Sequence, residues 1–300
     1  MPFGYAQWDC KLRANACICS EGCQKYFFDS LFARKKVGAC AMILAIDIGN
    51  TNIVLGGIEN GRQVFSARCA SDRNKTEDEY ALTIQGILQM RGVDPREIEG
   101  GILSSVVPIL RTVVPKAVYQ LTGKEILVVG SGLKTGLNIR MDNPAQLGSD
   151  MVVDAVAALA KYPAPIVFFD MGTATTMSVI DAAGSYIGGA IIPGLRVSVD
   201  ALSARAAQLP YINFAAPARL IGSNTVDCMQ SGAIYGCASM IDGMVDRVEA
   251  ELGQPVTAIL TGGLGTLVAP HCRREIHLEP DLLIQGLQIL YEKNQGRRKK

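Results

Sequence analysis

The feature that most constrains the fold is one local pattern that occurs in both halves of the chain. An apolar run leads into Asp47, and a second apolar run, 166–169, leads into Asp170. Each Asp is followed by x-Gly and a cluster of Thr or Asn. A turn glycine then follows at the same spacing, Gly61 after Asp47 and Gly184 after Asp170. Two copies of strand, Asp-x-Gly turn and hairpin indicate a duplicated domain.

The remaining sequence alternates strand-like and helix-like segments. Apolar runs between turn residues predict strands at 42–47, 53–58, 62–68, 101–106, 125–129, 166–170 and 257–261. A capping box at Thr76 and Glu79 starts a helix that ends at Gly92, and Pro144 suits the first turn of a helix running to about Tyr162. Further helices are expected at 225–252 and 281–294. This alternation is typical of the α/β class.

The charge balance excludes some classes of partner. The chain of 300 residues has 29 basic and 28 acidic residues, a formal net charge of +1. A nucleic-acid groove or a membrane-surface patch needs clustered Lys and Arg, so neither partner is expected. No run of 18 apolar residues occurs, so the sequence predicts no membrane-spanning helix.

The cysteines and the two ends of the chain set the limits of the fold. Five of the nine cysteines lie in the first 40 residues, and the others stand singly in apolar segments, which is typical of reduced thiols in the cytoplasm. Residues 1–41 have no sustained periodicity and are predicted to form a poorly ordered N-terminal extension. Their Cys17-x-Cys19 and Cys23 spacing matches no usual zinc pattern. Residues 297–300 are expected to be a basic, solvated tail.

The first candidate for chemistry is the turn that begins at Asp47. Gly49 allows a phosphate to approach the backbone, and Asn50, Thr51 and Asn52 offer hydrogen-bond donors to its oxygens. Asp47 can hold magnesium through water. An ordinary polar turn between two strands has the same composition, so this turn alone decides nothing.

The second copy makes the functional interpretation the stronger one. The turn from Asp170 to Thr176 repeats the pattern with hydroxyls in place of amides. Two such turns at equivalent depths of duplicated domains are expected to face each other and to hold a triphosphate from both sides. Positioning of this kind is most of what phosphoryl transfer requires.

Two other positions are candidates with a structural alternative. Asp150, at the start of a predicted helix, could accept the proton of an attacking hydroxyl, and Asp154, one turn later, competes for that role. A helix-start Asp also simply favours the helix dipole. Gly262 and Gly263 follow a strand and could let an adenine ring approach, although they could equally form a plain turn.

Several common motifs are missing. The segment 130–136 resembles a phosphate-binding P-loop, but Leu133 replaces the required glycine. The glycines at 263 and 265 lack the third member of a dinucleotide fingerprint. The two histidines, His271 and His277, do not indicate a Ser-His-Asp set.

Taken together, these motifs resemble type III pantothenate kinases over residues 42–294. The segments that carry the resemblance are 47–51 (Asp-Ile-Gly-Asn-Thr), 104–108 (Ser-Ser-Val-Val-Pro), 134–138 (Lys-Thr-Gly-Leu-Asn), 142–144 (Asp-Asn-Pro), 170–175 (Asp-Met-Gly-Thr-Ala-Thr) and 188–193 (Gly-Gly-Ala-Ile-Ile-Pro). The resemblance implies two duplicated ribonuclease-H-like domains of the actin-like ATPase type, 42–150 and 151–296, with mixed sheets flanked by helices. It also implies a homodimer.

The resemblance further implies an activity and its cofactors. Members of this family transfer the γ-phosphate of ATP to pantothenate, giving 4'-phosphopantothenate, the first step of coenzyme A synthesis. Magnesium accompanies the ATP, and a monovalent cation, potassium or ammonium, is also required. A kinase for another small alcohol and a non-catalytic nucleotide-binding regulator remain the alternatives.

The family pattern assigns roles to individual positions in this chain. Asp150 would be the proton acceptor and Asp170 would hold the monovalent cation. The implied ATP contacts are Asp47, Ile48, Gly49, Asn50, Thr51, Asn52, Ile53, Val54 and Thr173. The implied substrate contacts are Met141, Gly148, Ser149, Asp150, Met151 and Thr225.

Two of the substrate positions depart from the family pattern. The family commonly has Arg where this chain has Met151, and often has Tyr where this chain has Met141. The phosphate-binding segments match, so the departures concern recognition of the acceptor.

Overall fold

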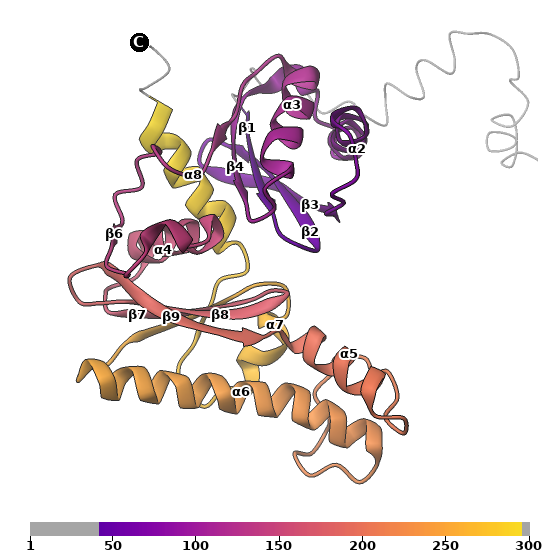
Figure 1. Ribbon diagram of the computed structural model, residues 1–300, viewed down its shortest axis with the longest axis vertical. Coiled ribbons are helices and arrows are strands. Elements are labelled where there is room, and N and C mark those ends of the chain that lie inside the picture. The colour runs from indigo at the N-terminus through magenta and orange to yellow at the C-terminus, as the bar shows by residue number, and fades with distance from the viewer. Residues whose placement is uncertain (1–41, 296–300) are drawn as a thin grey trace, which may run out of the picture. The chain divides into compact units, whose positions relative to one another are not determined.

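The computed structural model describes residues 42–295, arranged as two sheets with helices (Figure 1). The expectations for 1–41 and for the tail at 297–300 lie outside the described residues. The first sheet has the order β3-β2-β1-β4-β5 and the second has the order β11-β10-β7-β8-β9-β6. This is the α/β architecture with two mixed sheets that the sequence predicted.

The strands and helices have the following bounds. The first sheet contains β1 (Met42–Ile48), β2 (Asn52–Glu59), β3 (Arg62–Ala70), β4 (Ile98–Ser105) and β5 (Leu127–Val128). The second contains β6 (Asn138–Ile139), β7 (Ile166–Met171), β8 (Ala174–Ile180), β9 (Ser185–Pro193), β10 (Thr257–Thr261) and β11 (His277–Leu278). The helices are α2 (Glu77–Met90), α3 (Leu110–Thr122), α4 (Ser149–Lys161), α5 (Leu195–Arg205), α6 (Thr225–Leu252), α7 (Gly265–Val268) and α8 (Leu282–Asn294). Short 3₁₀ turns are η2 (Pro95–Glu97), η3 (Pro144–Gln146) and η4 (Ala269–His271). None of the helices within 42–295 is long and apolar enough to cross a membrane.

The duplication is visible in the strand pairing. β1, β2 and β3 form an antiparallel meander, as do β7, β8 and β9. On its other edge β1 pairs in parallel with β4, and β7 pairs in parallel with β10. Asp47 and Asp170 therefore occupy equivalent positions near the ends of the two central strands.

The outer face of the first sheet is covered by α2 and α3. The expected capping box is present: the Glu79 amide donates to Thr76 Oγ1, and the Thr76 amide donates to the Glu79 carboxylate. The inward face of α2 places Tyr80, Ile84 and Leu88 in the core, each nearly inaccessible to solvent. Burial of one such side chain contributes about 1.5–3 kcal/mol, so packing rather than helix propensity fixes this layer.

The helices α4 and α8 lie between the two sheets in Figure 1. α8 is the last helix in the described chain, yet it contacts β1 and β4 of the first sheet. It also packs along α4. One apolar cluster joins these elements; it includes Ala45, Ile102, Val153, Leu287 and Leu290. The start of α4 is thereby held beside the carboxyl end of β1, where the first Asp-x-Gly turn begins. The division at 150/151, which falls within α4, stays a prediction.

Some local expectations were wrong. The helix predicted from Pro144 is instead a 3₁₀ turn, capped by the Asn143 side chain, and α4 begins only at Ser149 after Gly148. The strand predicted at 125–129 is reduced to Leu127–Val128. Helix α3 was missed because Pro115 lies inside it, and an internal Pro normally indicates a break.

Candidate functional site

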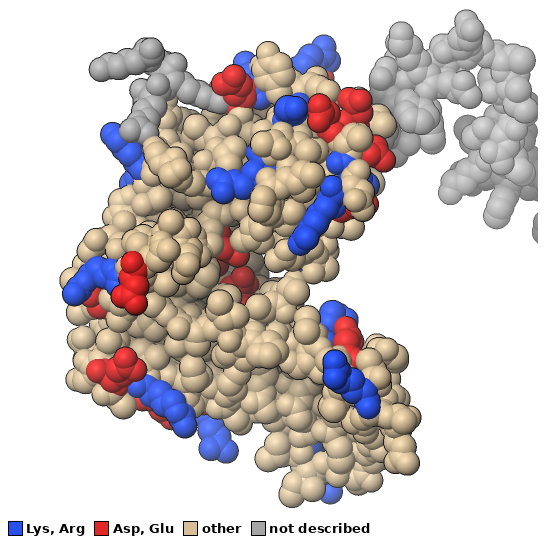
Figure 2. Space-filling view, in the orientation of Figure 1, with Lys and Arg blue, Asp and Glu red and all other residues tan. Residues whose placement is uncertain are grey.

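Four aspartates are close enough to interact electrostatically: one from each sheet and two from α4. Asp47 lies at the end of β1, Asp170 lies at the end of β7, and Asp150 and Asp154 lie one turn apart on α4. Their charges act on one another strongly enough to shift their pKa values. Figure 2 shows acidic atoms deep in a hollow of the drawn face, with Lys or Arg side chains above and below it. Among residues 42–295, no carboxylates lie close enough together to form a metal cage by themselves.

The carboxyl of Asp47, near the end of β1, has a strongly raised pKa. Burial raises its pKa from 3.8 to about 8, and the charges of Asp150 and Asp170 add to the shift. A hydrogen bond with Ser104, its neighbour on β4, acts in the opposite direction. Without a cation nearby, Asp47 therefore holds a proton at neutral pH.

Asp170 is shifted less, to a pKa of about 6, by burial and then by the charge of Asp150. The turn after β10 packs directly on it: a Cβ on Gly262 would lie 2.5 Å from Asp170 Oδ1 and 2.5 Å from the Met171 amide nitrogen. Gly262 also has a φ of +88°, a conformation that favours glycine. Gly262 thus supports the carboxylate at this position, a role that the sequence did not indicate.

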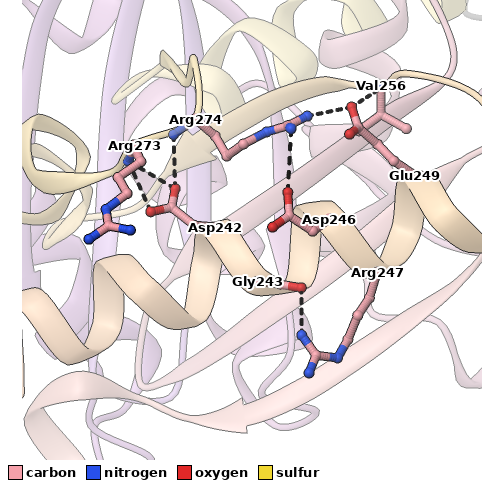
Figure 3. A network of polar contacts seen from close by, with 8 residues as sticks. All are labelled: Asp242, Gly243, Asp246, Arg247, Glu249, Val256, Arg273 and Arg274. Atoms are coloured by element: carbon pink, nitrogen blue, oxygen red, sulfur yellow. Dashed lines mark hydrogen bonds and ion pairs between the residues drawn. The ribbon is translucent and has the colours of Figure 1, made fainter.

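The segment that follows this turn is fixed to α6 by the network in Figure 3. The Asp242 carboxylate accepts the backbone N–H groups of Arg273 and Arg274 at 2.9–3.1 Å. The Arg274 guanidinium in turn pairs with Asp246 at 3.3 Å and with Glu249 at 2.5 Å. The network holds the segment that leads from α7 to β11 against α6.

Asp150 combines partial burial with accessibility. Its Oδ1 accepts the Met151 amide at 2.9 Å, and Gly148 leaves room for the carboxylate because any Cβ there would collide with it. Burial raises its pKa, while hydrogen bonds from backbone amides at the start of α4 lower it. Asp150 is thus only half-buried, and a carboxylate with a raised pKa that is not fully enclosed is suited to general base chemistry.

Asp154 differs from Asp150 in being completely enclosed. Its residue exposure is 1 %, and its Oδ1 has no hydrogen-bond partner among the described residues. Burial, followed by the charges of Asp170, Asp150 and Asp47, raises its pKa well above the ordinary value. A fully enclosed carboxyl cannot reach an acceptor hydroxyl, so of the two candidates for the base the geometry favours Asp150.

The two Asp-x-Gly turns meet directly. Thr51 Oγ1 and Thr173 Oγ1 are 2.9 Å apart, within hydrogen-bond distance. A cavity of about 440 Å³ opens beside them, and it is lined by Asn50, Thr173, Ala174, Ile191, Ile192, Pro193, Gly194 and Val197. The prediction of two facing turns thus agrees with the contact between their hydroxyls.

The positions assigned to the acceptor lie in two separate places. Ser149 is tied to the end of β4: its Oγ lies 3.0 Å from Ser104 Oγ and accepts the Ser105 amide at 3.1 Å. Met141 and Met151 are partly buried against one apolar cluster beneath α4. Thr225, by contrast, is the exposed first residue of α6.

Two arginines beside the turns were missed from the sequence. Arg73 Nη2 donates to Asn50 Oδ1 at 3.1 Å, and the guanidinium of Arg68 lies against Gly263. Neither belongs to a recognised motif. The only sequence signal was their place within the second strand of the first hairpin (Arg68) or just after it (Arg73), and this becomes informative only when the pairing of β3 with β2 is known.

Comparison with known proteins identifies the family. Residues 43–247 match type III pantothenate kinase, and the chain is 44% identical over 253 residues to the type III pantothenate kinase of Moorella thermoacetica, covering 84% of this chain and all of the relative. The chain belongs to the type III pantothenate kinase family. This confirms the resemblance drawn from the motifs.

Solved structures show the same fold at much lower identity. A Baf-family protein from Campylobacter jejuni aligns with a TM-score of 0.53 and 17% identity over 84% of this chain and 99% of its own. A protein assigned as a 2-dehydro-3-deoxygalactonokinase, from Sinorhizobium meliloti, has a TM-score of 0.53 and 13% identity over 83% and 96% of the two chains. These likenesses support the actin-like, sugar-kinase type of fold and nothing about the substrate.

Proposed function

We propose that this protein transfers the γ-phosphoryl group of ATP to the terminal hydroxyl of pantothenate, forming 4'-phosphopantothenate and ADP. The observation that carries the proposal is the pairing of two Asp-x-Gly turns, in contact through Thr51 and Thr173, with Asp150 at the start of α4. Family membership supplies the acceptor and the place at the start of coenzyme A synthesis.

Residues 47–54 and Thr173 bind the phosphates of ATP in this proposal. Asn50 and Thr173 line the cavity, and Thr51 lies within hydrogen-bond distance of Thr173. Their amide and hydroxyl groups can donate to phosphate oxygens, and the Thr51–Thr173 hydrogen bond would then be replaced. Two turns that hold one triphosphate place its γ-phosphorus in a fixed position, and such positioning is a large part of catalysis in phosphoryl transfer.

Asp150 acts on the acceptor. Its carboxylate takes the proton of the terminal hydroxyl as that oxygen forms a bond to the γ-phosphorus, and the bond from phosphorus to the β,γ-bridging oxygen breaks to release ADP. The raised pKa of Asp150 makes it a stronger base than an exposed Asp. Gly148, Ser149, Met141, Met151 and Thr225 form the rest of the acceptor site in this proposal.

The donor set fits cations. The buried carboxyls of Asp47, Asp154 and Asp170 have raised pKa values, and Asp154 Oδ1 has no partner among the described residues; both features are relieved when positive charge enters. We assign Asp47 to magnesium, through water, and Asp170 to potassium or ammonium. The cations would neutralise charge on the phosphates and carboxylates.

We further propose a homodimer in the cytoplasm. Large apolar side chains are exposed from β9 to the start of α6: Ile191 is 78% exposed, Tyr211 75%, Leu220 63% and Ile221 85%. Such a concentration of apolar groups favours a protein contact. The described cysteines, Cys69, Cys228, Cys237 and Cys272, are free thiols, as is usual in a reducing compartment.

Measuring ADP release against a panel of small alcohols tests the proposed function. With Mg-ATP and potassium we expect turnover with pantothenate and background rates with the other alcohols. Because Met141 and Met151 give the acceptor region an apolar lining, an uncharged alcohol is the specific alternative. Turnover of such an alcohol without pantothenate turnover would establish that alternative, and nucleotide binding with no turnover would indicate a regulator.

A further inference from the structure

The two phosphate-binding turns contain no cationic side chain. Residues 47–54 and 170–176 include neither Lys nor Arg, and four carboxyls border them. Sites for phosphoryl transfer ordinarily place Arg, Lys or metal ions against the phosphate charge. Side-chain cations for ATP must therefore come from other parts of the fold.

Arg68 reaches the site from the first sheet. It lies on β3, where it pairs with Val54 of β2, and it is exposed. A Cβ on Gly263 would lie 3.6 Å from its Nη1 and 3.8 Å from its Nη2, so the guanidinium lies against the turn that supports Asp170. Within residues 42–295 it forms no ion pair with a carboxylate. Its charge is available to a ligand between the two sheets.

Arg73 reaches the same site from the loop between β3 and α2. Its Nη2 donates to Asn50 Oδ1 at 3.1 Å, and it likewise has no carboxylate partner in the described part of the chain. The loop is held in place: the Ser71 amide donates to the Thr51 carbonyl at 3.0 Å, and the Tyr80 hydroxyl donates to the Asp72 carbonyl at 2.8 Å. Arg73 is thus fixed beside the cavity that Asn50 lines.

The neighbouring cation of that loop points elsewhere. Lys75 Nζ lies 3.5 Å from Thr83 Oγ1 and 5.7 Å from the centre of the Tyr80 ring, so it is occupied by α2. The loop therefore directs Arg73, and not Lys75, toward the phosphate-binding turns.

We propose that Arg68 and Arg73 bind the phosphates of ATP from two sides. The inference rests on the proposed kinase function and adds to it two positioning residues that hold the nucleotide. Arg73 uses one N–H group on Asn50, and a guanidinium has further donors for phosphate oxygens in the same plane. Arg68 binds from the side of Gly263 and so links β3 of the first sheet to the second sheet through the nucleotide.

Direct binding measurements on single variants test this inference. Calorimetry gives the Kd of Mg-ATP for wild type, Arg68→Gln and Arg73→Gln, and competition gives the Kd of adenosine, which has no phosphate. Losing hydrogen bonds to a charged group should weaken Mg-ATP binding by roughly 10-fold to 100-fold for each variant. Adenosine binding should stay unchanged, and Arg→Lys variants should fall between, since Lys keeps the charge but loses the planar fork.

Arg62 provides a matched control on the same strand. It is exposed at the far end of β3, where it pairs with Glu59 of the first hairpin. Arg62→Gln should bind Mg-ATP like wild type. If a Gln variant melts at a lower temperature than wild type, the corresponding Lys variant is used instead, because Lys keeps the aliphatic part of the side chain. The Kd values of Mg-ATP and adenosine are then compared for that variant.

Equal Kd values for Mg-ATP in the Arg68, Arg73 and Arg62 variants would overturn the inference. An equal loss of ATP and adenosine binding would also overturn it, because the arginines would then only shape the pocket. Neither measurement uses pantothenate. If the wild-type protein binds Mg-ATP but does not phosphorylate pantothenate, the proposed function is contradicted. The binding data still decide whether Arg68 and Arg73 bind the phosphates of ATP.

Discussion

The two copies of the Asp-x-Gly turn share a backbone but differ in what surrounds them. The first turn lies beside the loop that follows β3, and Arg73 of that loop donates to Asn50 of the turn. The second lies beside the glycine turn after β10 and an apolar wall that includes Ile191 and Val197. The pKa of Asp47 is raised to about 8 and that of Asp170 only to about 6. Duplication thus supplied a symmetric geometry, and the neighbouring elements placed Arg73 beside the first turn and an apolar wall beside the second.

The largest effect on activity is expected for Asp150, which belongs to neither copy of the Asp-x-Gly turn. Asp150→Asn should reduce the rate of phosphoryl transfer by about 10²–10⁴-fold, because it removes the proposed general base. Mg-ATP binding should be retained, as both turns remain intact. Steady-state rates and the Kd of ATP check this. A variant with more than half the wild-type rate would show that Asp150 only caps α4.

A change at the acceptor side should have the next largest effect. Pantothenate carries a carboxylate, and Met151 offers it no charge-assisted hydrogen bond, which contributes roughly 1.5–3 kcal/mol. The double variant Met151→Arg, Met141→Tyr should lower KM for pantothenate by about one to two powers of ten with a similar kcat. An unchanged KM would mean that other groups already bind the carboxylate.

The monovalent-cation requirement assigned to Asp170 should be separable from the magnesium requirement assigned to Asp47. Turnover should depend on potassium or ammonium as well as magnesium, because Asp170 adds negative charge beside the phosphates. Asp170→Asn should weaken that dependence, while Asp47→Asn should chiefly weaken magnesium dependence. Turnover rates in sodium and potassium buffers, at matched ionic strength, measure the dependence on the monovalent cation. Equal wild-type rates in both buffers would contradict the role of Asp170.

The difference between the two aspartates should also appear in the pH dependence of stability without metal. Above the ordinary pKa of 3.8 the unfolded chain loses these protons while the native state keeps them, so the free energy of unfolding falls as pH rises. The contribution of Asp170 ends near pH 6 and that of Asp47 near pH 8. Asp170→Asn should therefore flatten only the lower part of the curve, and Asp47→Asn should flatten it up to about pH 8. Denaturant melts in a chelating buffer check this, and identical curves for both variants would refute it.

Sequence alone predicted those parts of the molecule that local signals determine. The two turns, the capping box at Thr76 and Glu79, and the helix 225–252 all follow from short-range chemistry. The packing of α8 between the sheets could not be predicted, since its partners lie far away in the chain. The same is true of Arg68 and of Asp154 Oδ1, which has no hydrogen-bond partner within residues 42–295, because their environments depend on strand register and burial. The sequence also failed to predict α3, a helix that continues through Pro115 although an internal Pro normally indicates a break.

The product of the reaction tests the central claim most directly. Wild-type protein is incubated with Mg-ATP, potassium and pantothenate, and the mixture is analysed by mass spectrometry for phosphopantothenate and ADP. We expect the two products in equal amounts, and neither above background with Asp150→Asn. ADP formed without phosphopantothenate, or phosphopantothenate formed equally well by Asp150→Asn, would contradict the account.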